Sequence, residues 1–112
     1  MIDSYLFGKM KIQDQIFTKD LIILPDKILS PWWRAKGHRI VMDDLSEVFD
    51  YTFEILVIGT GYYGLVKIDG EVWEQAEKKD ISIITAKTSK AVELFNKNHL
   101  TKKTIGAFHL TC

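Results

Sequence analysis

The second half of the chain alternates between strand-like and helix-like patterns, and this alternation limits the folds open to it. Apolar runs at 54–58, 81–85 and 104–110 have the length and β-branched content of buried strands. The segments between them, 70–79 and 89–98, carry their apolar residues on one helical face. Crossovers of this length make consecutive strands parallel and the connections right-handed. The pattern therefore predicts an α/β fold with a parallel second half.

The first 42 residues carry strand-like patterns and turn signals instead. Apolar residues alternate along 10–17 and predict a hairpin, and the run "LIIL" at 21–24 ends at the turn dipeptide Pro25-Asp26. A short helix is predicted over 43–49, with Asp43 as its N-cap. We therefore expect a β-rich N-terminal part in front of the parallel half.

The length of 112 residues is typical of one domain, so we expect a single domain over residues 1–112. Lys plus Arg and Asp plus Glu number 15 each, which gives a formal net charge of zero. Proteins that bind nucleic acid usually carry an excess of basic residues, and the composition argues against that class. The longest apolar runs are far shorter than the roughly 20 residues of a membrane-spanning helix, so we expect no membrane partner.

The only cysteine is Cys112, so no disulfide can form within the chain. The first ten residues, "MIDSYLFGKM", lack the basic start and the long apolar stretch of a secretory signal peptide. Both features favour a cytoplasmic location.

Three glycines in "ILVIGTGYYG", Gly59, Gly61 and Gly64, have the G-x-G-x-x-G spacing of a dinucleotide-binding turn. In a true site the following helix begins inside this motif, because its N-terminus binds the pyrophosphate. Here the next helix cap is Asp69, and the following strand ends near Lys87 without the acid that binds the ribose. We therefore expect no NAD or NADP and no other cofactor.

The glycine loop still lies where open α/β sheets bind ligands, beyond the carboxyl ends of the parallel strands. Gly59–Gly64, Ala86–Thr88 and Thr111–Cys112 should all emerge at this edge. If the loop's N–H groups converge, they form a nest for a small anion, which Arg34 or His38 would help to bind. The alternative is that the glycines only permit positive φ angles in a tight loop.

A second candidate site is "SPWWRAKGHR", residues 30–39. Neighbouring residues of a strand face opposite sides, so one of Trp32 and Trp33 should lie near the surface. An exposed Trp beside Arg34 and His38 has the composition of a recognition surface. Alternatively, one Trp packs in the core while the other covers a neighbouring loop.

Residues suited to catalysis or to metal binding are sparse. No pair of histidines has metal-ligand spacing. His109 and Cys112 are three residues apart on the last predicted strand, so their side chains face opposite sides and do not form a thiol–imidazole pair. No catalytic residue and no metal site is predicted.

Six segments resemble, in the same order, those of a known family: "IDSYLFG", "LIILPDKI", "WWRAKGH", "ILVIGTGYYGL", "TAKTSKAVELFN" and the terminal "HLTC". This is the adipogenesis-associated, Mth-type domain family, whose members include a human cytosolic protein and a mitochondrial assembly factor of respiratory complex I. The resemblance implies a three-layer α/β fold with a mixed central sheet and no established enzymatic activity.

Together these features predict a small cytoplasmic binding or assembly-type protein that contacts a protein partner through the Trp-Trp-Arg-Gly-His segment. The alternative is a small-anion or metabolite-binding protein, or an enzyme that acts on such a molecule, whose pocket lies at the glycine loop. The predicted binding residues of the two sites are Trp32, Trp33, Arg34, His38, Gly59, Thr60, Gly61 and Tyr62.

Overall fold

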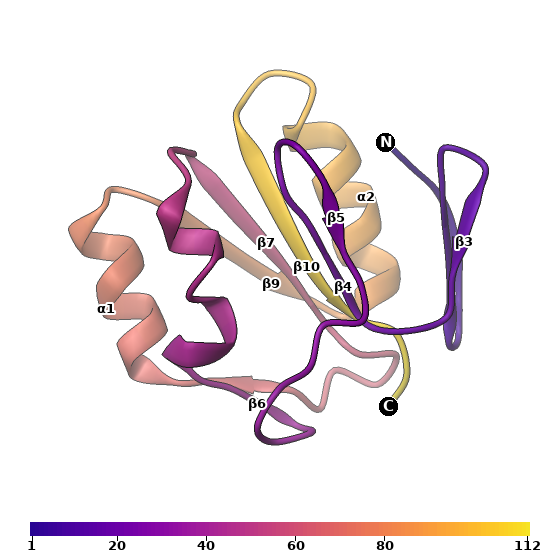
Figure 1. The fold of residues 1–112 in the computed structure, drawn as a ribbon, viewed down its shortest axis with the longest axis horizontal. Helices are drawn as coiled ribbons and strands as arrows, with labels where there is room; N and C mark the ends of the chain where they lie inside the picture. The colour runs from indigo at the N-terminus through magenta and orange to yellow at the C-terminus, as the bar shows by residue number, and fades with distance from the viewer.

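The computed structural model describes all 112 residues and contains one central five-stranded mixed sheet (Figure 1). Its strands lie in the order β5 (Ile28–Leu29), β4 (Leu21–Ile23), β10 (Thr104–His109), β7 (Ile55–Thr60) and β9 (Ser82–Ala86). Strands β10, β7 and β9 are parallel, while β4 and β5 run antiparallel. The predicted α/β fold and its mixed sheet are thus confirmed.

Helices α1 (Gly70–Lys78) and α2 (Thr88–Asn98) cover opposite faces of this sheet. Leu56 and Ile58 pack in the same apolar cluster as α1, whereas Ile55 and Val57, which alternate with them along β7, pack in the cluster of α2. Successive side chains of a strand face opposite sides, so the molecule has three layers.

A second sheet at the N-terminus packs beside α2. It consists of the antiparallel strands β1 (Ile2–Leu6), β2 (Lys9–Ile12) and β3 (Gln15–Phe17). The predicted hairpin is formed by β2 and β3. Its two turn residues, Gln13 and Asp14, both have positive φ, as the twist of a tight hairpin requires. The layer of α2 is therefore shared with a small β-sheet.

The other face carries two short 3₁₀ helices, η1 (Met42–Leu45) and η2 (Val48–Asp50), in place of the helix predicted over 43–49. The predicted N-cap Asp43 is wrong. The carboxylate of Asp44, inside η1, accepts the N–H of Val41 at 2.9 Å and holds the tight turn instead.

The parallel half has the bounds that its sequence pattern predicts to within one or two residues. The largest difference is β7, which continues to Thr60 because Gly59 and Thr60 pair with Phe108 and His109 of β10. Strands β6 (Arg39–Ile40) and β8 (Lys67–Ile68) form a separate two-residue parallel pair, which lies below the central sheet in Figure 1. No helix has the combined length and apolar character needed to cross a lipid bilayer.

Candidate functional site

The carboxyl ends of the three parallel strands meet at one edge of the sheet, as their order predicts. Thr88 joins them there, and its side chain is fully buried. Its hydroxyl accepts the N–H of Gly61 at 2.9 Å and donates to the carbonyl of His109 at 2.6 Å. Lys87 occupies the N-cap position of α2, and the Thr88 hydroxyl links the end of β7 to β10.

A buried ionic cluster lies beside this junction and consists of Asp20, Arg34 and His109. The Oδ2 atom of Asp20 lies 2.8 Å from Nη1 of Arg34 and 2.6 Å from Nδ1 of His109. Oδ1 of the same carboxylate accepts the N–H of Leu110 at 2.8 Å. The Arg34 side chain is only 4% exposed, so its charge is balanced inside the protein rather than in water.

The charge of Asp20 is stabilised by its three partners. Burial alone would raise the pKa of this carboxyl. The hydrogen bonds from His109, from the Leu110 N–H and from Arg34 outweigh that effect and hold the pKa of Asp20 below its ordinary value of 3.8. An ionised carboxylate can only accept, so the contact with Asp20 assigns a proton to Nδ1 of His109, and Nη2 of Arg34 lies 3.0 Å from the same nitrogen. The opposite ring nitrogen, Nε2, is buried and has no hydrogen-bond partner.

The two tryptophans of the Trp-Trp-Arg segment have opposite surroundings, as neighbours on an extended chain should. Trp32 is buried, donates from Nε1 to the carbonyl of Asp44 at 2.9 Å and has the Arg34 guanidinium 4.8 Å from its ring centre. Trp33 is 76% exposed. Only Trp33 of this pair is therefore available on the surface, while Trp32 and Arg34 form a stacked pair beneath it.

A pocket of about 380 Å³ opens beside Trp33. Its walls include the side chains of Trp32, Arg34 and Asp20 together with Lys19 and Thr111 near the chain end. Asp20 and Arg34 neutralise each other, and Lys19 makes no ion pair. The pocket therefore has an excess positive charge at its rim.

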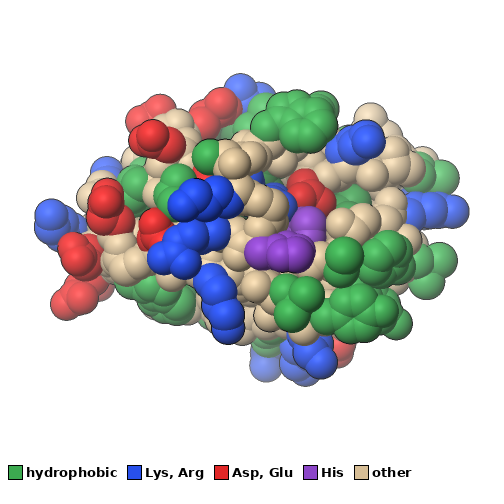
Figure 2. Space-filling model, turned by 90° about the horizontal axis from the view of Figure 1, so that it is seen from below, with side chains coloured by type: hydrophobic (Ala, Val, Ile, Leu, Met, Phe, Trp, Pro, Cys, Tyr) green, Lys and Arg blue, Asp and Glu red, His purple; other side chains and the backbone are tan.

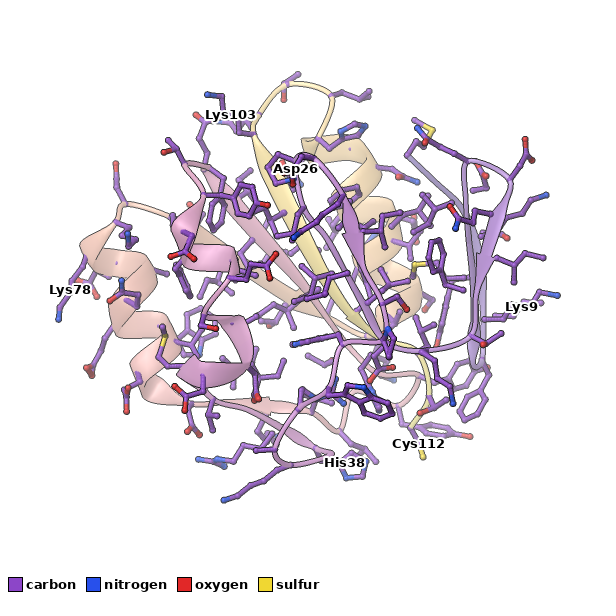
Figure 3. The ribbon with its side chains drawn as sticks, viewed as in Figure 1. Lys9, Asp26, His38, Lys78, Lys103 and Cys112 are labelled. Atoms are coloured by element: carbon purple, nitrogen blue, oxygen red, sulfur yellow. The ribbon has the colours of Figure 1, made fainter.

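His38 lies on an exposed turn near the pocket and faces the buried cluster. Its ring centre is 6.2 Å from that of His109 in an edge-to-face arrangement. In Figure 3 His38 and Cys112 both lie at the lower end of the molecule, where the central strands end. The sequence analysis predicted that Arg34 or His38 reaches the carboxyl edge of the sheet. The structure brings both residues close to the strand ends.

The glycine loop does not form the predicted anion nest, because its amides have acceptors within the protein. Gly61 donates to Thr88 Oγ1, Tyr62 donates to the carbonyl of Thr111 at 2.9 Å, and Gly64 donates to the carbonyl of Gly61 at 3.2 Å. Thr60 uses its hydroxyl to bond the carbonyl of Ala86 at 3.0 Å. These three amides therefore do not converge on a ligand, and the loop closes the edge of the sheet.

The glycines are needed for this close packing. A side chain at Gly59 would lie 2.9 Å from Thr88 Oγ1, and one at Gly61 would lie 2.9 Å from the His109 ring. Gly61 also has φ +103°, a conformation that other residues rarely adopt. As predicted, the following helix begins only after Asp69. The G-x-G-x-x-G spacing is therefore explained by packing at the strand ends.

An exposed aromatic cluster lies on the same end of the molecule and consists of Phe7, Tyr62 and Tyr63. The ring centres of Phe7 and Tyr62 are 5.5 Å apart, and those of Tyr62 and Tyr63 are 5.0 Å apart. Each of the three side chains has about half of its surface exposed. Thr111 links this cluster to Trp33, because it accepts from Tyr62 and also lines the Trp33 pocket.

Figure 2 looks onto this end of the molecule. Histidine side chains lie near its centre, with a group of Lys and Arg side chains directly on one side of them and a group of hydrophobic side chains on the other. The face thus combines exposed aromatic rings with positive charge around a rigid, internally neutralised centre.

Three residues of this face were not predicted from the sequence: Asp20, Phe7 and Thr88 as a link between strands. Asp20 reaches His109 because Leu21 of β4 pairs with Phe108 of β10. Phe7 reaches Tyr62 because the β1–β2 turn packs at the chain end, where the Gly8 N–H donates to the Leu110 carbonyl at 2.7 Å. Both contacts depend on strand neighbours that alternation alone does not identify.

Residues 2–109 match a protein family described as a protein of unknown function, DUF498/DUF598. Among solved structures, the fold is similar to a conserved hypothetical protein from Pyrococcus horikoshii, at 25% identity, with 100% of this chain and 99% of that chain covered and a TM-score of 0.85. It is also similar to a structure titled an outer membrane protein from Bartonella henselae, at 25% identity over 99% and 94% of the two chains and a TM-score of 0.85. A Rhodopseudomonas palustris protein shares the fold at 22% identity over 97% and 82% of the chains, with a TM-score of 0.78.

Proposed function

The chain belongs to the DUF498/DUF598 family of proteins of unknown function, and we propose that it is a cytoplasmic binding or assembly-type protein that contacts a protein partner. The contact face is the carboxyl edge of the sheet, with Trp33 and the Phe7–Tyr62–Tyr63 cluster. The resemblance of the sequence to the adipogenesis-associated, Mth-type domain family, which includes an assembly factor, supports this proposal.

The exposed aromatic cluster carries the proposal. Tyr62 contacts both Phe7 and Tyr63, and these three rings, each about half exposed, present a large apolar area to water. Tyr and Trp are enriched among the residues that contribute most to protein–protein affinity, because they bury much area and lose little rotamer freedom. Such a patch is costly to leave in water and typical of a docking surface.

The centre of the face suits a binding role better than catalysis. Asp20 and Arg34 balance each other's charge, and the free Nε2 of His109 is buried. The buried ionic cluster therefore presents no free base or nucleophile of its own to solvent. The cluster instead fixes the position of the backbone that presents Trp33 and Tyr62.

A small anion is the second candidate ligand, and the pocket beside Trp33 favours it. Lys19 stands unpaired at the rim of this pocket of about 380 Å³, and the exposed Trp33 ring lies next to it. A carboxylate or phosphate on a flat small molecule would pair with Lys19 and stack on Trp33. In this proposal Arg34 forms part of the pocket wall, and its charge is neutralised by Asp20 rather than by the ligand.

The test is capture from native lysate with three forms of the protein: wild type, the double variant Tyr62→Ala/Tyr63→Ala, and Leu100→Ala. Leu100 is also an exposed apolar residue, but it follows α2 at the opposite edge, so its variant is the matched control. We expect a stoichiometric partner that wild type and Leu100→Ala retain and the double variant loses.

The competing ligand is distinguished in the same preparation by mass spectrometry of co-purified small molecules. A bound anion that Lys19→Ala releases, without any protein captured by wild type, would replace the first proposal by the second. A partner that all three forms retain equally would show that this face is not the contact surface.

A further inference from the structure

Strand β9 (Ser82–Ala86) is the last strand of the central sheet and pairs only with β7 (Figure 1). Its residues, "SIITA", include no proline and no charge, the usual devices that keep an open edge from pairing. The strand forms five regular pairs with β7. It is therefore an uncharged edge strand that no other strand of the chain pairs with.

The backbone groups that face outward can be identified from one hydrogen bond. The N–H of Ser82 donates to the carbonyl of Glu54, at the start of β7, at 3.0 Å. Backbone direction alternates along a strand, so Ser82 and Ile84 face β7 while Ile83 and Thr85 present their N–H and C=O groups to the open side.

The open edge also has room beside it. Pockets of about 290 Å³ and 450 Å³ lie along β9, and Trp73 of α1 lines both of them. Trp73 is partly exposed although it lies on a helix that packs against the sheet. An added strand would therefore gain hydrogen bonds from β9 and apolar contact with this ring.

Charge is distributed unequally along this edge. Glu77 and Asp80 line the pocket at the start of β9, whereas Lys67 lines the one at its end, where Lys87 follows. None of these four side chains makes an ion pair within the chain. An antiparallel copy of β9 fits this edge, because it brings Asp80, which lies just before the strand, near Lys87, which follows the strand in the other copy.

We propose that β9 pairs antiparallel with β9 of a second copy of this chain, so that two central sheets join into one. A two-fold axis perpendicular to the sheet places one residue opposite itself. With Ile84 at this position, Lys87 of one copy lies opposite Ile81 of the other and next to its Asp80. Centring on Ile83 would set Lys79 against Lys87, and centring on Thr85 would move Lys87 three residues away from Asp80.

In this register Ile83 and Thr85, the two outward-facing residues, pair across the interface by backbone hydrogen bonds. The two copies of Ile84 meet on the face that carries α2, in the pair type whose side chains approach most closely. Both Trp73 rings lie on the opposite face, beside the axis. The surface is self-complementary, as a symmetric dimer requires.

Thr85→Pro is the sharpest test, because it removes an N–H that has no partner within the chain. An edge strand tolerates proline where the N–H faces outward, so the monomer should keep its fold. Thr85→Val is the matched control, since it keeps the N–H and the branched shape. By sedimentation velocity at about 100 μM, we expect dimers for wild type and Thr85→Val and monomers for Thr85→Pro.

A charge exchange tests the pairing direction and does not depend on proline. Lys87→Glu places an acid beside Asp80 of the other strand and should raise the dimer dissociation constant about tenfold. Adding Asp80→Lys should restore most of the affinity, because opposite charges then lie next to each other again. Circular dichroism checks that each variant is folded.

A monomeric wild type at this concentration would overturn the proposal, as would a dimer whose mass Thr85→Pro leaves unchanged. If Thr85→Pro does not fold, the charge exchange decides: a dimer insensitive to both Lys87→Glu and its reversal is not formed by β9. A different protein captured by β9, while wild type stays monomeric, would show that the edge serves a foreign strand.

Discussion

The carboxylate of Asp20 lies 2.6 Å from the Nδ1 atom of His109, although the two residues are 89 positions apart in the sequence. Asp20 immediately precedes β4 and His109 ends β10, and the antiparallel pairing of these strands brings them together. The same carboxylate holds Arg34. One acidic side chain thus fixes a strand end, a buried arginine and a histidine below the proposed contact face.

Replacing Asp20 with Asn should destabilise the protein strongly. The substitution leaves the guanidinium of Arg34 buried without a counter-ion, which costs about 3 kcal/mol when one member of a buried pair is removed. The measurement is the free energy of unfolding in urea. Lys27→Gln is the control, because it breaks the exposed Lys27–Glu47 pair and should leave the urea midpoint nearly unchanged. Equal effects of the two changes would contradict the importance of burial.

The contribution of Asp20 should also depend on pH. Its pKa is lower in the folded state than the ordinary value of 3.8, so its charge stabilises the fold fully above that value. The stabilisation is lost as pH falls below 3.8 through the folded-state pKa. Urea unfolding at a series of pH values should therefore show a constant gap between wild type and Asp20→Asn near neutrality and a shrinking gap in acid. A gap that widens in acid would contradict the sign.

Thr88→Val should cost about 2 to 3 kcal/mol of stability. Valine has the same shape, but it leaves the Gly61 N–H and the His109 carbonyl without the hydroxyl that bonds both. Thr88→Ser keeps the hydroxyl and loses only a methyl group, at a cost of about 1 kcal/mol. Chemical denaturation of both variants compares the two, and a larger loss for Ser than for Val would show that packing matters more than the hydrogen bonds.

The parallel half of the fold was predictable because its signals are local. Each buried strand is a short apolar run, and each helix carries one apolar stripe, so the order of elements implies crossovers and a shared edge. The same reasoning identified Trp33 as one of two alternatives for exposure. It failed at 43–49, where the side chain of Asp44 holds a tighter turn than helical periodicity predicts.

The site was harder to predict because its contacts are long-range. Arg34 looks like a surface cation next to an exposed Trp, and nothing near it in the sequence indicates that Asp20 neutralises it. The amides of the glycine loop looked free because their acceptors, Thr88 and Thr111, come from two other strand ends. A pattern read along the chain identifies the edge where segments meet but not which groups bond there.

Gly61 and Gly70 provide a final, paired prediction about the glycine loop. Alanine at Gly61 must adopt φ near +103° and would bring its methyl within 2.9 Å of the His109 ring, so Gly61→Ala should cost more than about 1 kcal/mol. Gly70 begins α1 with nothing within 4 Å of an added methyl, so Gly70→Ala should be neutral or stabilise by about 0.5 kcal/mol. Thermal and urea unfolding measure both. A tolerated Gly61→Ala would show that this loop relaxes, and that its closed form does not hold the aromatic cluster in place.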